Sequence, residues 1–182
     1  MAGNARHRIL DGALELLRIE GGGSITLEAA AKEVGLTKPG LMYHFPTKEA
    51  LMLAVVDHVA DRWEQLLLDR LDRPLEGASP LQRIRAYVEV ALDAPFDRAD
   101  FAIYADAHYR TALTDTWVRR IEPWITLPDA LPDAARARLT AARLLADGYW
   151  TAVATDVFPV PDRDRDHLLG VADDLLKDES SR

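Results

Sequence analysis

Residues 26–48 contain two short helical segments separated by a glycine turn, and this stretch restricts the fold more than any other. Thr26 is suited to cap a helix over Leu27–Val34, because its hydroxyl can accept a hydrogen bond from the first turn. Gly35 ends that helix, since glycine adopts the left-handed backbone conformation without steric cost. Thr37 then caps a second helix, over Thr37–Tyr43. The pattern predicts a helix-turn-helix, a motif whose second helix enters the major groove of DNA.

The second helix carries groups that suit close approach to a polyanion. Its outward positions hold a hydroxyl, an ammonium, bare backbone, a phenol and an imidazole, from Thr37, Lys38, Gly40, Tyr43 and His44. Gly40 costs about 1 kcal/mol of helix stability relative to alanine. A glycine in the centre of such a short helix favours close approach of another molecule to the backbone. We therefore expect this helix to contact nucleic acid.

The stretch resembles the DNA-binding domain of TetR-type transcriptional regulators. The residues that carry the resemblance are Thr26, Ala30, Gly35, Leu36, Thr37, Gly40, Leu41, Tyr43, His44, Phe45, Lys48, Glu49 and Leu51. Pro39 departs from the family pattern, in which many members have a small or polar residue at that position. The resemblance implies a repressor or activator that binds a palindromic operator in double-stranded DNA as a homodimer.

The resemblance also implies a set of DNA-binding residues, which are Thr26, Thr37, Lys38, Gly40, Leu41, Tyr43, His44 and Lys48. Of these, Lys38 and Gly40 are expected at base edges. Four other residues are expected on phosphates, where they would set the register but carry little sequence information. These residues are Thr37, Tyr43, His44 and Lys48. Arg6, His7 and Arg8 would lie near the phosphate backbone, or else they belong to a solvated helix start.

Apolar residues recur with helical spacing along the rest of the chain, which predicts an all-α fold. About nine helices are expected, over residues 1–20, 27–34, 37–43, 48–71, 80–94, 97–106, 109–124, 134–157 and 162–177. Thr47, Ser79 and Asp133 are predicted N-caps. We expect a three-helix helix-turn-helix DNA-binding domain over residues 1–47 and a helical C-terminal effector-binding and dimerisation domain over residues 48–182.

The net charge of −8 is concentrated outside the helix-turn-helix. Residues 1–48 hold six basic and five acidic residues, a net charge of +1, so the remaining 16 basic and 25 acidic residues give −9. DNA would repel the acidic body, which orients the N-terminal end toward it.

The helix predicted over 134–157 is apolar nearly all round, so more than one side of it must be covered. The chain's own core covers one side, and a second subunit would cover the other. By resemblance, this helix and the last helix form a four-helix dimer interface. The expected interface residues are Leu145, Val153, Leu168, Val171, Ala172 and Leu175.

The C-terminal body is rich in aromatic residues, with Asp147 and Trp150 one helical turn apart. An aromatic cavity with a carboxylate suits a flat or cationic organic ligand. The expected ligand-binding residues are Phe101, Tyr104, His108, Trp117, Asp147 and Trp150. Ordinary core packing is the alternative for each aromatic residue, and an internal hydrogen bond is the alternative for Asp147. By resemblance, the body is similar to the multidrug-sensing, efflux-regulating branch.

Several classes of protein do not fit the sequence. The chain has no cysteine, which excludes disulfides and thiolate chemistry. No acid/base or nucleophile pairing predicts an enzyme, and no motif predicts a cofactor or a metal site. No run of about 18 apolar residues predicts a membrane span, and the N-terminus lacks the apolar core of a signal peptide, so we expect a cytoplasmic protein.

Two functional hypotheses remain. The first is a ligand-responsive DNA-binding repressor, released from its operator by a small organic effector. The second is a helical small-molecule-binding or scaffold protein that does not read DNA, which only the acidic balance favours.

Overall fold

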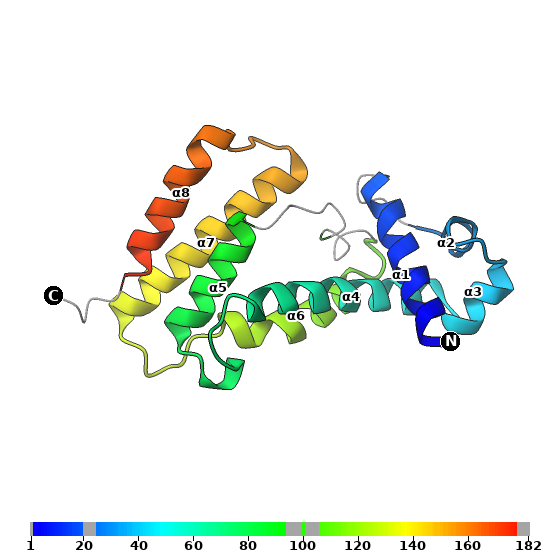
Figure 1. The fold of residues 1–182 in the computed structure, drawn as a ribbon, viewed down its shortest axis with the longest axis horizontal. Coiled ribbons are helices and arrows are strands. Elements are labelled where there is room, and N and C mark those ends of the chain that lie inside the picture. The colour runs from blue at the N-terminus through cyan, green and yellow to red at the C-terminus, as the bar shows by residue number, and fades with distance from the viewer. Residues whose placement is uncertain (1, 20–24, 94–99, 101–105, 178–182) are drawn as a thin grey trace. The chain divides into compact units, whose positions relative to one another are not determined.

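The computed structural model is all-helical over the residues that it describes, which are 2–19, 25–93, 100 and 106–177 (Figure 1). The helices are α1 (Ala2–Ile19), α2 (Leu27–Glu33), α3 (Lys38–His44), α4 (Lys48–Leu68), α5 (Pro80–Asp93), α6 (Arg110–Ile125), α7 (Asp133–Thr155) and α8 (Asp162–Leu175). The predicted all-α fold class is confirmed. The helix expected over 97–106 lies outside the described residues, apart from Asp100 and Asp106. A 3-10 turn, η1 (Leu75–Gly77), occupies part of the expected loop before α5.

The chain forms two compact units, one from residues 1–63 and 97–120 and the other from residues 64–96 and 121–182. The boundary expected after residue 47 separates a DNA-binding domain from an effector-binding domain. The two packing units do not test this division by function, so it stays a prediction. No helix within the described ranges combines the length and the apolar character that a membrane span requires.

Hydroxyl side chains begin the helices where the sequence predicts. The hydroxyls of Thr26, Thr37 and Thr47 accept from the backbone N–H groups three residues on, at 3.1, 3.2 and 3.0 Å. Ser79 accepts from the N–H of Gln82 at 3.3 Å and donates its own backbone N–H to the Gln82 side chain at 2.9 Å. The prediction for Asp133 is wrong, because proline occupies the N-cap position of α7 and the aspartate is already helical.

Arginine side chains bind the carboxyl ends of helices other than their own. The last carbonyls of a helix lack an intrahelical donor and carry partial negative charge, so a guanidinium both completes their hydrogen bonding and balances the dipole. In the first unit, Arg8 donates to Val34 O at the end of α2, and Arg6 donates to His44 O at the end of α3. In the second unit, Arg165 donates to Leu92 O in the last turn of α5, and Arg83 donates to Pro123 O and Thr126 O at the end of α6. At the end of α8, Arg85 donates to Leu176 O and Arg138 to Lys177 O.

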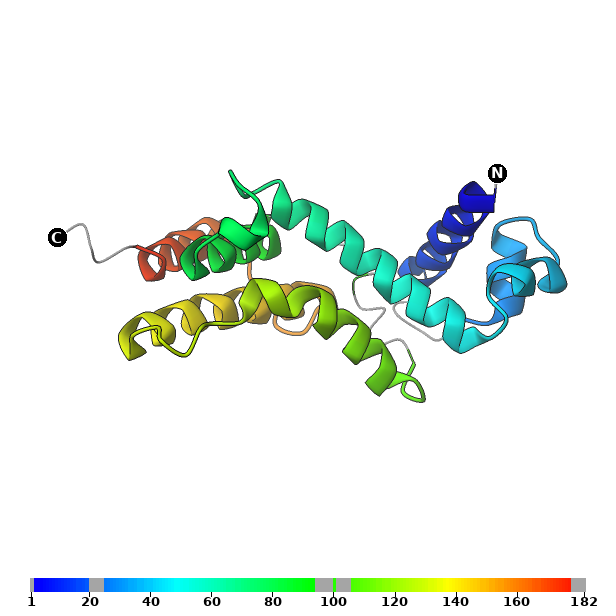
Figure 2. The same cartoon turned by 90° about the horizontal axis from the view of Figure 1, so that it is seen from below.

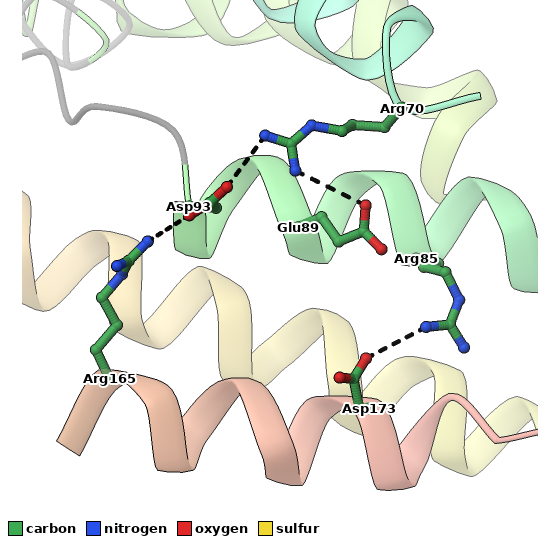
Figure 3. A network of polar contacts seen from close by, with 6 residues as sticks. All are labelled: Arg70, Arg85, Glu89, Asp93, Arg165 and Asp173. Carbon is green, nitrogen blue, oxygen red and sulfur yellow. Dashed lines mark hydrogen bonds and ion pairs between the residues drawn. The ribbon is translucent and has the colours of Figure 1, made fainter. Parts of the chain in front are cut away.

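Helices α5, α7 and α8 pack together in the second unit (Figures 1 and 2). Their core is aliphatic and includes Ile84, Val88, Ala91, Leu92, Leu139, Ala142, Ala146, Ala172 and Leu176. A layer of ion pairs joins the helices outside this core (Figure 3). Asp93, at the end of α5, accepts from Arg165 of α8 at 2.6 Å and from Arg70 at 3.3 Å. Arg85 of α5 reaches Asp173 of α8 at 3.2 Å.

The two arginines lower the pKa of the Asp93 carboxyl below its ordinary value of 3.8, first through the hydrogen bond from Arg165 and then through that from Arg70. A carboxyl with a lowered folded-state pKa stabilises the fold above its unfolded-state pKa. It loses that contribution as the pH falls through the folded-state value.

Replacing Asp93→Asn is expected to lower the free energy of unfolding at pH 7 by about 1 kcal/mol, the upper range for an exposed ion pair. The difference from the wild type should shrink as the pH falls from 3.8 toward the lowered folded-state pKa, because protonation then removes from the wild type the charge that the variant lacks. Urea unfolding at a series of pH values from about 7 to about 2 measures it. Asp129→Asn, in the exposed loop before α7, is the matched control. An equal loss for both variants at pH 7 would contradict the role of the pairs.

Candidate nucleic-acid interface

Helix α3 is anchored by two apolar residues that face the interior of the first unit. Leu41 is fully buried and Phe45, directly after the helix, is 1% exposed. Residues of α1, including Ile9, Ala13 and Leu17, are fully buried in the same unit. The prediction that Leu41 contacts DNA is therefore wrong, because its side chain is needed to hold α3 in place.

Glycines shape the approach of α2 to its neighbours. Gly35 has φ +69°, which ends α2 in the left-handed conformation, as the sequence predicts. The next N–H, of Leu36, donates to Ala31 O at 2.8 Å and closes the turn. In α1, a Cβ added to Gly12 would lie 2.4 Å from Cγ1 of Val34, so only glycine lets α1 meet the end of α2 this closely.

The two arginines near the N-terminus bind the protein itself. The guanidinium of Arg6 lies 4.4 Å from the centroid of the Phe45 ring and donates to His44 O at 3.4 Å. Arg8 donates to Val34 O at 3.3 Å. These contacts join α1 to the ends of α2 and α3. Both guanidinium groups hold helix ends and both side chains are exposed, so the expected phosphate contact stays a prediction.

The outward side of α3 presents Tyr43, which is 85% exposed. The ring of Tyr43 packs edge-on against the half-buried His44, with centroids 5.2 Å apart. Thr26 and Thr37 are also exposed, although each hydroxyl caps a helix. Gly40 has an internal reason to be glycine, because an added Cβ would lie 3.2 Å from Oγ1 of Thr37.

Both lysines of the predicted interface form ion pairs. Lys38 binds Glu28 of α2, and both side chains are exposed, at 46% and 63%. The hydrogen bond from this ammonium is the main cause that lowers the pKa of the Glu28 carboxyl. Lys48, at the start of α4, binds Asp106 at 2.7 Å, and these side chains are 28% and 11% exposed. A phosphate must therefore share or displace a carboxylate at each lysine.

Sequence reasoning missed both carboxylates. In the sequence, Glu28 is a favourable acidic residue in the first turn of α2. Its ion pair with Lys38 of α3 is visible only in the structure. Asp106 is far from Lys48 in the sequence, and no local pattern connects the two.

The predicted ligand-binding residues do not form one described site. Phe101 and Tyr104 lie outside the described residues. His108 is exposed, and Trp117 packs edge-on against Trp63 with ring centroids 5.7 Å apart. These two belong to the first unit, whereas Asp147 and the half-buried Trp150 belong to the second.

The carboxylate of Asp147 forms internal hydrogen bonds, which is one of the two alternatives predicted for it. One carboxylate oxygen accepts from the hydroxyl of Tyr87 at 2.7 Å, and the other accepts from Arg143 at 2.5 Å. The residue also lines an open hollow of about 450 Å³ along α7, with Leu144, Gly148, Thr151, Ala152, Thr155 and Val157. No aromatic residue lines this hollow.

The predicted dimer residues differ in exposure. Val171 of α8 is 50% exposed, and Leu145, Val153, Leu168 and Leu175 are half-buried. Ala172 is 1% exposed in the single chain, so its assignment to an interface is wrong, because it is already covered within the chain. Leu144, which the sequence analysis did not include, is 55% exposed on α7.

Residues 9–55 match the family model described as bacterial regulatory proteins, tetR family. The chain is 35% identical over 89 residues to the HTH-type transcriptional regulator RutR of Escherichia coli, and 32% identical over 91 residues to the nucleoid occlusion factor SlmA of Vibrio atlanticus. Each match covers 49% of this chain. It spans less than half of the relative's own length, 40% of RutR and 44% of SlmA.

Two solved structures share the fold over nearly the whole chain. One is described as a TetR-family transcriptional regulator from Rhodococcus sp., with a TM-score of 0.66, 20% identity and coverage of 94% of this chain and 98% of that one. The other is the multidrug binding protein EbrR complexed with imidazole, with a TM-score of 0.63, 21% identity and 95% coverage of both chains.

Replacing Gly35→Ala is expected to lower the free energy of unfolding by about 1 kcal/mol, because an L residue at positive φ is strained. Nothing lies within 4 Å of the added Cβ, so the cost is that of the backbone alone. Gly77→Ala is the matched control, since its Cβ also meets nothing and its φ is not in that region. Equal stability of the two variants in urea unfolding would contradict the strain at the turn.

Proposed function

We infer from the match of residues 9–55 to the tetR family model that this chain is a bacterial regulatory protein of that family. We propose that it is a DNA-binding transcriptional regulator, acting as a repressor on a palindromic operator and released by a small organic effector. The proposed regulator has no enzymatic activity and lies in the cytoplasm, where the DNA is.

One observation carries the DNA-binding proposal. Helix α3 is fixed from behind by Leu41 and Phe45, and its outward side presents Tyr43 and Lys38, which the core does not use. A short helix held in this way suits insertion into a major groove about 12 Å wide. The phenol hydroxyl of Tyr43 is suited to a phosphate. The ammonium of Lys38 is suited to a base edge.

The dimer proposal has support from the apolar surfaces of α7 and α8. Leu144 and Val171 are 55% and 50% exposed, although both are large aliphatic residues. Burying such residues stabilises an interface by about 25 cal/mol for each Å² of apolar surface. A second copy of the chain is the occupant that a palindromic operator requires, because the two-fold symmetry of the protein matches that of the site.

An effector site in the C-terminal body also belongs to this proposal. The indole N–H of Trp124 is fully buried and has no hydrogen-bond acceptor among the described residues. A buried donor in that state costs about 1–3 kcal/mol, so a ligand that brings an acceptor would recover part of it. We keep an aromatic or cationic organic molecule as the effector class.

Replacing Tyr43→Phe is expected to weaken DNA binding by roughly threefold to tenfold, which corresponds to about 0.7–1.4 kcal/mol, the value of one solvent-exposed hydrogen bond. The loss should be similar on the operator and on unrelated duplexes, because a phosphate contact carries no sequence information. Tyr149→Phe makes the same chemical change in α7 and should leave binding unchanged. Fluorescence anisotropy of labelled duplexes measures the DNA affinity of the wild type and of both variants. Unchanged affinity of Tyr43→Phe would remove the phenol from the phosphate contacts.

Replacing Val171→Asp is expected to shift the wild-type dimer toward monomer at micromolar concentration, because each interface would bury two uncompensated carboxylates. A tenfold or greater rise in the dissociation constant corresponds to about 1.4 kcal/mol or more. Sedimentation velocity measures it. Val118→Asp is the control, since Val118 is 45% exposed on α6. A wild type that sediments only as monomer would refute the dimer.

A further inference from the structure

The ion pair between Glu28 and Lys38 joins α2 to α3, two helices that pack against each other (Figure 1). Lys38 is the first residue of α3, and Glu28 lies in the first turn of α2. Both side chains are exposed, at 63% for the acid and 46% for the lysine, so both can reach a molecule that docks against α3. The pair is a surface feature of the proposed interface and has no part in the buried core.

A carboxylate at a DNA-binding surface restricts what it can contact. It has acceptors only, and phosphate oxygens repel it, so its remaining partners are the amino groups of bases. In the major groove cytosine presents an amino donor with no acceptor of its own. Adenine presents an amino donor beside a ring-nitrogen acceptor. Glu28 therefore suits cytosine better than adenine, and the carbonyl oxygen of thymine repels it.

The ammonium of Lys38 has the complementary preference. It carries three donors and no acceptor, and one donor is directed at Glu28. The other two suit the ring nitrogen and carbonyl oxygen that guanine presents in the major groove. Guanine and cytosine lie opposite each other in one base pair. A lysine bound to a carboxylate can therefore read both bases of that pair without breaking the ion pair.

We propose that the Glu28–Lys38 pair reads one G·C base pair in each half-site, with Lys38 donating to guanine and Glu28 accepting from the amino group of the paired cytosine. The inference rests on the proposed DNA-binding function and adds a base preference to it. Reversing the base pair brings donor to donor at Lys38 and acceptor to acceptor at Glu28, and replacing it with A·T brings acceptor to acceptor at Glu28.

The test is selection from a pool of random DNA duplexes, followed by sequencing, for the wild type and the variants Glu28→Gln and Glu28→Ala. The wild type should enrich inverted half-sites that contain an invariant G·C pair. Both variants should relax that position by at least about fivefold, the lower value for one good base contact, and leave the other positions unchanged. Glutamine should also admit adenine, which it binds through two hydrogen bonds.

Glu33→Gln is the matched control, because Glu33 is an exposed residue of the same helix and its replacement changes the net charge equally. It should retain the wild-type motif. Circular dichroism checks that each variant is folded. A wild-type motif that both Glu28 variants retain unchanged would overturn the inference and leave the proposed function intact. No enriched motif from the wild type would overturn both, so the two failures are distinguishable.

Discussion

Guanidinium groups bound to helix carboxyl ends connect helices within both units of this chain. Five helices end on an arginine from another helix. Such hydrogen bonds are charge-assisted, and each contributes about 1.5–3 kcal/mol when it is protected from solvent and less when exposed. Only four of the 22 basic residues are lysine. The planar fork of arginine can hold a carbonyl and a carboxylate at once, as Arg165 and Arg85 do, whereas lysine presents a single point charge.

The contacts of the arginines with helix ends affect which cations are available to bind DNA. Arg6 and Arg8 hold the ends of α3 and α2, so they fix the position of the proposed reading helix. The two lysines of the predicted interface each lie against a carboxylate. A phosphate competes with Glu28 or Asp106 for these ammonium groups, which lowers non-specific attraction and raises the share of affinity that depends on sequence. A chain with net charge −8 is in this way suited to selective binding of DNA.

Local physical chemistry made most of the fold predictable. Helix ends follow from hydroxyl caps, glycine at positive φ and proline, all of which act within a few residues, so Thr26, Thr37 and Gly35 behave as expected. Contacts between distant segments were not predictable, because no sequence pattern connects Lys48 to Asp106 or Tyr87 to Asp147. Leu41 and Ala172 were misassigned for a different reason. Membership in a motif or an apolar stripe does not say which residues face outward, and both are buried.

Salt dependence of DNA affinity tests the central claim, that the outward side of α3 binds DNA, most directly. Fluorescence anisotropy of a labelled random-sequence duplex requires no knowledge of the operator. If phosphates are bound, the logarithm of the affinity should fall linearly with the logarithm of salt concentration, with a slope of about −0.9 for each phosphate contacted. Several contacts for each dimer predict a steep decline between 50 and 200 mM salt, roughly an order of magnitude or more. Absence of binding at low salt, or affinity that does not change with salt, would contradict the claim.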